Sequence, residues 1–260
     1  MIDGHCHLDL KFGCCQTAIK RLYDDAKTVG IKTVVLLNIE GLQFAGKQGF
    51  KNLDVIKNSK EYEPFFYVFP SLHPFEPDVI DKLEFYHEIG IAGLKLHPRM
   101  HNYHIENKAC VNLVKKAGHM ELPVMICCFP DGINIKLGNT AASIGRLADQ
   151  AQDTKIAIGH AGGHKIIDYL MVAKSCKNLY LDLSFSLLYY RGSSIINDIK
   201  YVINNINGER IIWGTDYPDR PYSKSVKESL IVFEELEINS FLKNKIFNKN
   251  CIDYLGIFKR

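Results

Sequence analysis

Short apolar runs alternate with longer amphipathic stretches along the whole chain. The runs are rich in β-branched and aromatic residues without strict apolar/polar alternation, which is typical of strands buried on both faces. Eight strands are predicted, over residues 1–7, 32–39, 65–72, 91–96, 122–128, 155–159, 179–183 and 210–214. Helices are predicted between and after them, over residues 16–29, 42–59, 77–89, 106–120, 139–152, 164–176, 193–207, 223–236 and 239–254.

This alternation of strands and helices predicts parallel βα units. Eight units fill the 260 residues with nothing left over, which favours a closed (β/α)8 TIM barrel. An open doubly wound sheet is the alternative fold. No linker rich in Pro, Gly or Ser divides the chain, and no segment is of low complexity, so we expect one domain over residues 1–260.

Composition removes several classes of protein from consideration. The net charge of +3 is spread along the chain, so nothing indicates nucleic acid or a membrane surface as a partner. No apolar run approaches the roughly 18 to 20 residues of a membrane span, and no signal peptide is visible, so we expect a cytoplasmic protein. The eight cysteines lack Cys-x-x-Cys pairs and are expected to be reduced thiols. A small-molecule substrate remains as the expected partner, and a homo-oligomer is left open.

Polar residues of unusual type gather at the predicted strand ends. In a (β/α)8 barrel the active site lies at the C-terminal ends of the strands. Seven candidates follow or end a predicted strand there: His5, His7, His73, Lys95, His97, His160 and Asp216. Because five of the ten histidines fall in these places, we expect a metal or catalytic centre.

The residue types at these strand ends suit a divalent metal ion. His5 and His7 are two apart on a strand, so both imidazoles lie on one face. Imidazole and carboxylate are ligands for Zn²⁺ and related ions, which lower the pKa of a water molecule. Asp216 is a candidate both for metal ligand and for proton shuttle, and His160 for ligand or stabiliser of a developing oxyanion.

Other candidates carry less specific signals. Lys95 and His97 also share a strand face and are candidates to complete the metal site, although an ion pair inside the barrel explains Lys95 equally well. Four residues in the loops after strands are candidates for substrate binding: His73, Arg99, Tyr217 and Arg220. An arginine such as Arg99 can hold a carboxylate or phosphate through two hydrogen bonds, but most loop arginines are simply solvated.

Four segments resemble, in the same order, motifs of the amidohydrolase superfamily, and most of all its amidohydrolase-2 branch of hydrolases and decarboxylases. These segments are Asp3-Gly4-His5-Cys6-His7, Gly93-Leu94-Lys95-Leu96-His97-Pro98, Gly159-His160-Ala161-Gly162-Gly163 and Trp213-Gly214-Thr215-Asp216-Tyr217-Pro218. The resemblance implies a metal-dependent barrel without the flanking β-sandwich of many superfamily members. It also implies that His5, His7 and Asp216 are metal ligands, and that His160 is a ligand or a catalytic residue.

The chain departs from the family pattern at the fifth strand. The family often places a histidine at the end of this strand, where this sequence has Cys127 and Cys128. A thiolate at Cys127 can bind Zn²⁺, but a buried cysteine on an apolar strand is more often part of the core. In some superfamily members a lysine on strand four is carbamylated and bridges two metals. A carbamylated, metal-bridging Lys95 is therefore a further alternative.

The function expected from these residues is metal-dependent hydrolysis of a small amide, ester or lactone. The cofactor is expected to be one or two divalent ions, with Zn²⁺ preferred and Mn²⁺ as the alternative. Decarboxylation of an aromatic or unsaturated acid at the same centre is the second hypothesis. A TatD-like phosphodiesterase and a barrel that binds ligand without turnover are the remaining ones. Lys95 argues against the TatD-like enzyme, because that family would place a glutamate there.

Overall fold

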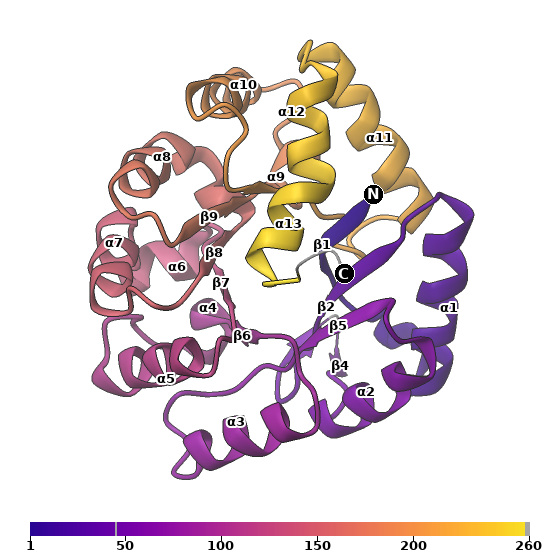
Figure 1. Ribbon diagram of the computed structural model, residues 1–260, viewed down its shortest axis with the longest axis vertical. Helices are drawn as coiled ribbons and strands as arrows, with labels where there is room; N and C mark the ends of the chain where they lie inside the picture. Colours follow the sequence, from indigo (N-terminus) through magenta and orange to yellow (C-terminus); the bar gives the residue numbers. More distant parts are fainter. Residues whose placement is uncertain (45, 258–260) are drawn as a thin grey trace.

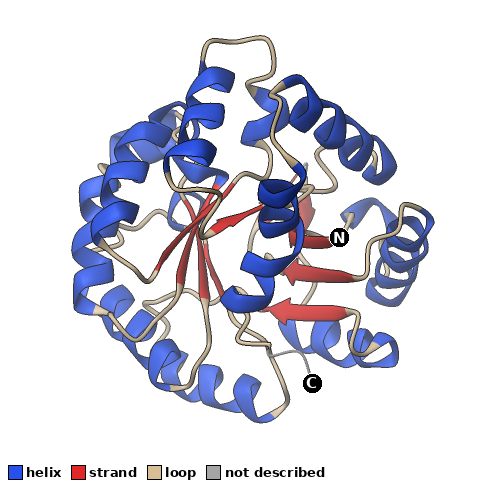
Figure 2. Cartoon of the chain, turned by 45° about the horizontal axis from the view of Figure 1, so that its top comes forward, coloured by secondary structure: helices blue, strands red, loops and turns tan. Residues whose placement is uncertain are grey.

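Eight parallel strands form the centre of the molecule, and helices surround them (Figures 1 and 2). The computed structural model describes residues 1–44 and 46–257. The central strands are β1 (Ile2–Cys6), β2 (Thr33–Leu37), β5 (Phe66–Phe69), β6 (Leu94–Leu96), β7 (Val124–Cys127), β8 (Ile156–Gly159), β9 (Leu179–Asp182) and β10 (Ile211–Ile212). Each strand pairs with its neighbours in the chain, in the orders β1-β2-β5 and β6-β7-β8-β9-β10. The predicted (β/α)8 barrel is therefore confirmed.

Backbone hydrogen bonds join these two sheets on both sides. Between β5 and β6, Ala92 N donates to Val68 O at 3.0 Å and Lys95 N donates to Pro70 O at 2.9 Å. Between β1 and the segment after β10, Gly4 N donates to Trp213 O at 2.9 Å. The chain can approach so closely there because Gly214 has no side chain. A Cβ at that position would lie 2.6 Å from the His5 backbone nitrogen.

Helices connect the strands nearly as predicted. The main ones are α1 (Cys15–Thr28), α2 (Asn52–Ser59), α3 (Val79–Glu88), α5 (Lys108–His119), α7 (Ala141–Gln150), α8 (Ile166–Ser175), α10 (Ile195–Asn205) and α11 (Tyr222–Glu235). The predicted helix at 42–59 is wrong in its first half. Gly41 and Gly46 have positive φ there, and the chain forms a hairpin of β3 (Gln43–Phe44) and β4 (Lys47–Gln48). Glycine lowers helix propensity and favours such turns.

Short elements fill the loops and the end of the chain. After strands lie η1 (Leu10–Phe12), α4 (Pro98–His101), α6 (Gly132–Leu137), η3 (His160–Lys165) and α9 (Ser186–Tyr189), and η2 (Lys60–Tyr62) follows α2. The predicted last helix consists of α12 (Ser240–Asn244), a π-helical turn η4 (Lys245–Lys249) and α13 (Asn250–Tyr254). None of the helices that the structure describes combines the length and apolar character needed to cross a bilayer.

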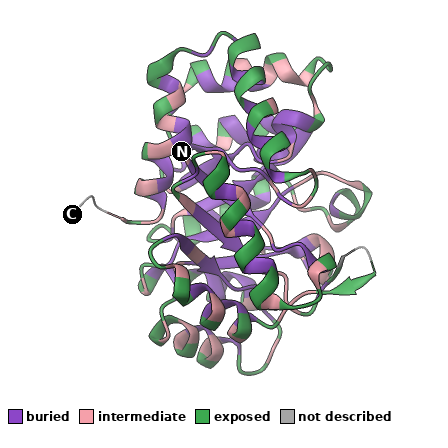
Figure 3. Cartoon of the chain, turned by 90° about the vertical axis from the view of Figure 1, so that its right-hand side faces the viewer, coloured by how far each residue is buried: buried purple, intermediate pink, exposed green. Residues whose placement is uncertain are grey.

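Two apolar clusters hold the barrel together. The larger lies between strands and helices, and buried residues concentrate around the strands while exposed residues lie on the outer helix faces (Figure 3). The smaller contains inward-facing residues such as Met125 and Tyr180, together with Cys251 and Tyr254 of α13. Helix α13 therefore closes the N-terminal end of the barrel (Figure 1). Cys127 and Asp182 lie two residues after Met125 and Tyr180 and on the same strand faces. Polar side chains therefore point into the barrel at its C-terminal end.

Candidate metal centre and substrate pocket

A cavity of about 610 Å³ opens among the loops that follow the strands. Five candidate residues line it, among them His7, His160 and Asp216. His97 and Arg99, which follow β6, also line it, and Phe129 and Phe185 contribute an aromatic wall. The cavity therefore lies where the sequence predicts the active site.

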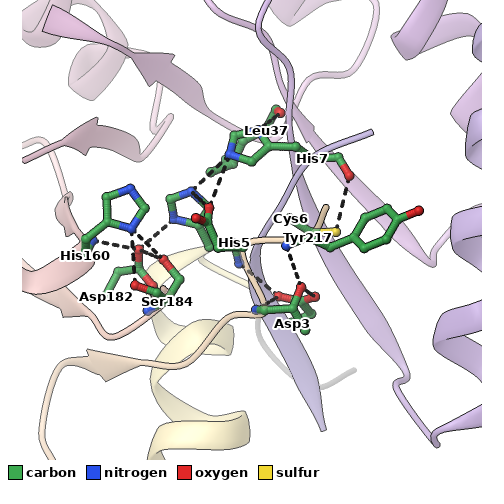
Figure 4. A network of polar contacts seen from close by, with 11 residues as sticks. Asp3, His5, Cys6, His7, Leu37, His160, Asp182, Ser184 and Tyr217 are labelled. Atoms are coloured by element: carbon green, nitrogen blue, oxygen red, sulfur yellow. Dashed lines mark hydrogen bonds and ion pairs between the residues drawn. The ribbon is translucent and has the colours of Figure 1, made fainter. Parts of the chain in front are cut away.

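The histidines of β1 present the same ring nitrogen to one point. His5 is fully buried, and its Nδ1 lies 2.6 Å from Asp182 Oδ2. His7 Nδ1 lies 2.7 Å from the carbonyl oxygen of Leu37 (Figure 4). Each acceptor fixes the tautomer with its proton on Nδ1, so Nε2 keeps a free lone pair. The two free nitrogens are 3.3 Å apart.

Asp216 completes a triangle of donor atoms with these nitrogens. Its Oδ1 lies 3.2 Å from His5 Nε2 and 3.5 Å from His7 Nε2. The backbone holds it there, since Asp216 N donates to His5 O at 2.9 Å. Asp216 also has a positive φ of 52°, a conformation that is uncommon for residues with a side chain.

The spacing within this triangle fits a small divalent cation. With metal–donor bonds of about 2.0 to 2.1 Å in tetrahedral geometry, neighbouring ligand atoms lie about 3.3 to 3.4 Å apart. The observed separations of 3.2, 3.3 and 3.5 Å match this value. A second group of potential ligands, His5, His160 and Asp182, is also close together. Its atoms are already occupied by hydrogen bonds, so we assign the candidate centre to His5, His7 and Asp216.

His160 lies beside this centre in a tightly fixed turn. Its ring is 4.9 Å from the His5 ring, and its Nδ1 lies 3.2 Å from Ser184 O. Residues 160–163 all have positive φ, so the backbone turns sharply where β8 ends. Ser186 Oγ donates to His160 O at 2.7 Å, and His160 N donates to Asp182 Oδ2 at 3.2 Å. The ring is thus held at the cavity lining, close to the Cys127 thiol.

Asp182 links His5 to His160 and was not among the predicted residues. Its carboxylate receives four hydrogen bonds, from His5 Nδ1, His160 N, Ser184 N and Ser184 Oγ. The sequence carried a signal, because Asp182 is an acid within the apolar strand Leu179-Tyr180-Leu181-Asp182-Leu183. Ser184 shares this role but had no comparable signal, since serines are common in loops.

Asp3 is the second buried carboxylate that sequence reasoning missed. It accepts hydrogen bonds from Thr215 N at 2.9 Å, Thr215 Oγ1 at 2.6 Å and Tyr222 OH at 2.9 Å. Burial raises the pKa of Asp3 to about 6, although these hydrogen bonds act to lower it. Asp3 therefore ties β1 to the segment that carries Asp216, which keeps the two halves of the donor triangle together.

The protonation states of the groups at the centre suit metal binding and proton transfer. Burial lowers the pKa of His7 to about 4, so its ring is neutral at physiological pH. Burial alone would raise the pKa of Asp216, but His160, His5 and His7 hold it well below the usual range. Burial also opposes charging of His160, yet Asp216 and Cys127 raise its pKa to about 9. The centre thus combines neutral and anionic donors with a neighbouring cationic proton donor.

Lys95, His97 and Cys127 lie close to the centre but outside the donor triangle. Burial lowers the pKa of Lys95, and among the described residues its ammonium has no carboxylate within ion-pair distance. His97 is 7% exposed, and its Nδ1 lacks a hydrogen-bond partner. Burial would raise the pKa of the Cys127 thiol, but His97 and His160 hold it well below its usual range. The roles predicted for these three residues as additional ligands remain predictions.

The predicted substrate residues occupy different places. Arg99 lines the cavity, where Asp131 binds its Nη1 at 2.6 Å and leaves the buried Nε without a partner. His73 packs against the rings of His101 and Tyr103, outside the cavity lining. Tyr217 is buried with its hydroxyl 3.4 Å from Asp9 Oδ2, and Arg220 pairs with Asp219 and Glu228. Of the four, only Arg99 borders the cavity.

Comparison with known proteins identifies the family. The model of the family described as Amidohydrolase (Amidohydro_2) matches residues 2–257. The chain belongs to this family. No curated protein sequence gives a significant match to this amidohydrolase. The resemblance of its motifs to the amidohydrolase-2 branch is thereby confirmed, and the chain is an enzyme of the amidohydrolase kind.

Solved structures share the fold of this amidohydrolase at low sequence identity. An uncharacterized TIM-barrel protein from Bordetella bronchiseptica is 18% identical, with a TM-score of 0.77 over 91% of this chain and 83% of the other. A probable 2-pyrone-4,6-dicarboxylic acid hydrolase from Acinetobacter baumannii, solved with citric acid bound, is 16% identical (TM-score 0.70; 98% and 99% covered). A 5-carboxyvanillate decarboxylase from Novosphingobium aromaticivorans, solved as a D314N mutant with manganese and 3-methoxy-4-hydroxy-5-nitrobenzoic acid, is 14% identical (0.66; 91% and 80%).

Proposed function

We propose that this amidohydrolase is a divalent-metal-dependent hydrolase of small esters, lactones or amides. The observation that carries the proposal is the donor triangle of His5 Nε2, His7 Nε2 and Asp216 Oδ1 beside the cavity. Three protein ligands at tetrahedral spacing leave a position for water or substrate, as catalytic zinc sites do. We expect Zn²⁺ there, with Mn²⁺ as the alternative, since a relative was solved with manganese.

The residues around the triangle have complementary roles in the proposed reaction. A divalent ion held there supplies a water molecule of lowered pKa and polarises a carbonyl group. Asp216, which is ionised, accepts a proton from the attacking water and transfers it to the leaving group. His160, which is cationic, donates a hydrogen bond to the oxygen that becomes negative at the carbonyl carbon.

The cavity favours a substrate that carries a carboxylate. Three cationic side chains line it, those of Arg99, Lys11 and Lys47, of which Lys11 is paired with Asp9. Arg99 is fixed by Asp131, so a substrate carboxylate would meet an oriented guanidinium. Two of the similar structures were solved with citric acid and with a nitrobenzoic acid, both of which carry carboxylates.

Decarboxylation of an aromatic or unsaturated acid is the second candidate. Phe129 and Phe185 at the cavity wall favour it, because they offer an apolar surface to a ring. Both candidates use the same centre and differ in the bond that breaks.

Activity measurements on purified, metal-loaded protein test the proposal. We expect an ester and lactone panel to be hydrolysed, with one equivalent of Zn²⁺ or Mn²⁺ bound. His5→Ala and Asp216→Ala should each lower kcat/KM by at least about a hundredfold, while circular dichroism shows an intact fold. His164→Ala is the matched control, because His164 is exposed and lies outside the cavity lining.

Two results would overturn the assignment. Release of carbon dioxide from aromatic acids without hydrolysis of any ester or lactone would establish the decarboxylase instead. Wild-type activity in His5→Ala or Asp216→Ala would show that the reaction takes place elsewhere.

A further inference from the structure

Phe185 has an unfavourable backbone conformation at the cavity wall. Its φ of 59° and ψ of −58° are those of a classic γ-turn, and Ser186 N donates to Ser184 O across it at 2.5 Å. This turn is rare and strained for a residue with a side chain. A glycine would adopt the same dihedral angles at little cost. Because the sequence has a large aromatic residue there, the strain is explained only if the ring itself has a use.

The flanking serines account for the turn but not for the ring. Ser184 O lies 3.2 Å from His160 Nδ1 (Figure 4). Ser186 Oγ donates to His160 O at 2.7 Å. These contacts use backbone and serine atoms, and Phe185 contributes only its dihedral angles. The turn could therefore hold His160 equally well with glycine at position 185.

The ring of Phe185 forms an aromatic wall beside the candidate metal centre. It lines the cavity, with its centroid 5.9 Å from the ring of His160. Phe129 packs edge-on against it at 5.0 Å, and Tyr189 stacks behind it at 4.8 Å and 22°. Tyr189 is not part of the cavity lining, so it supports the ring from behind. A substrate bound at His160 must therefore lie against a fixed aromatic surface.

We propose that Phe185 is the specificity-determining residue of the cavity and selects substrates whose reacting group is attached to a flat, conjugated ring. The proposal rests on the function proposed above, because the ring is expected to carry the bond that is cleaved. A flat ring can stack on Phe185 or meet it edge-on, at the centroid distances of 4.5 to 7 Å typical of aromatic pairs. A saturated ring of the same size is puckered and lacks the π-system for such contacts.

Binding of two matched carboxylates to the zinc-loaded protein tests this selection without turnover. Benzoate and cyclohexanecarboxylate differ in the flatness of the ring, and the saturated ring is at least as apolar. We expect isothermal titration calorimetry to show benzoate binding about 2- to 10-fold more tightly to the wild type. The preference should fall to about one in Phe185→Leu and Phe185→Gly. In Phe241→Leu, a matched change at an exposed residue of α12, it should be retained.

Two further measurements separate the ring from the turn and from the proposed reaction. Zinc affinity should be unchanged in Phe185→Gly, because glycine preserves the turn that holds His160. The ratio of kcat/KM for methyl benzoate and methyl cyclohexanecarboxylate should fall in Phe185→Leu by the same factor as the binding preference. Loss of the binding preference in protein that hydrolyses neither ester would support the role of Phe185 and refute the hydrolase. A preference for benzoate that survives in Phe185→Leu, or is absent from the wild type, would overturn the proposal.

Discussion

Replacing Asp182 by asparagine tests whether a residue that touches no metal sets the metal affinity. In the wild type the carboxylate accepts four hydrogen bonds, the shortest from His5 Nδ1 and Ser184 Oγ at 2.6 Å. Asparagine has one oxygen acceptor and brings an NH₂ group that must face donors. His5 can then accept from this NH₂ through Nδ1, which moves its own proton to Nε2. That tautomer has no lone pair for a metal ion.

The expected loss follows from this change of tautomer. Removal of such a partner of a ligating histidine typically lowers metal affinity 10- to 100-fold, or about 1.4 to 2.8 kcal/mol. His160 should also be held less firmly, because its backbone N–H loses an ionised acceptor. We therefore expect kcat at saturating zinc to fall as well.

Competition with a chromophoric chelator measures the zinc dissociation constant directly. Thermal unfolding of the metal-free variants separates loss of a ligand partner from loss of the fold. Asp168→Asn, at an exposed position of α8, is the matched control and should behave like the wild type. A folded Asp182→Asn protein that binds zinc within about twofold of the wild type would refute the reasoning, because a misplaced His5 must cost more.

Three further predictions address the fold and the centre. Gly214→Ala should lower the free energy of unfolding, measured by urea titration, by about 1 to 3 kcal/mol, because the new Cβ would overlap His5. Gly132→Ala is the control and should leave this free energy unchanged, because its Cβ would meet no atom within 4 Å. Since burial lowers the pKa of His7 to about 4, the His7 ring should stay neutral and able to bind metal through Nε2 down to about pH 5. An NMR titration of the His7 ring in metal-free protein checks this, and a midpoint near 6.5 would contradict it. Cys127→Ser should reduce zinc affinity less than about tenfold, since Cys127 is outside the donor triangle, and a larger loss would make it a ligand.

The barrel was largely predictable because its determinants are local. Each βα unit has its own buried strand and amphipathic helix, so periodicity located all eight central strands. It failed at residues 42–51, where Leu42 and Phe44 continued an apolar pattern that the glycines interrupt. The spacing of apolar residues carries no information about the backbone conformations that single glycines allow.

The centre was predictable only as far as residue type and strand position go. His5, His7 and Asp216 are polar residues at strand ends, and the structure brings their donor atoms together. Asp182 was missed because nothing in the sequence shows that its carboxylate meets His5, which lies 177 residues away. The positions of His73, Tyr217 and Arg220 depend on loop conformations, which no sequence period encodes. The same holds for Phe185, whose γ-turn is visible only in the backbone angles.

The hydrogen bonds between β1 and the segment after β10 have a consequence for the synthesis of the protein. Asp3 and Thr215, which join there, are 212 residues apart in the sequence. A chain emerging from a ribosome has both histidines of β1 almost at once but lacks their carboxylate partner until seven strands have followed. The donor triangle forms only when the barrel closes, so metal taken up there stabilises the finished fold over every partial one. A metal ion bound there would thus stabilise only the completed barrel, in addition to its role as a cofactor.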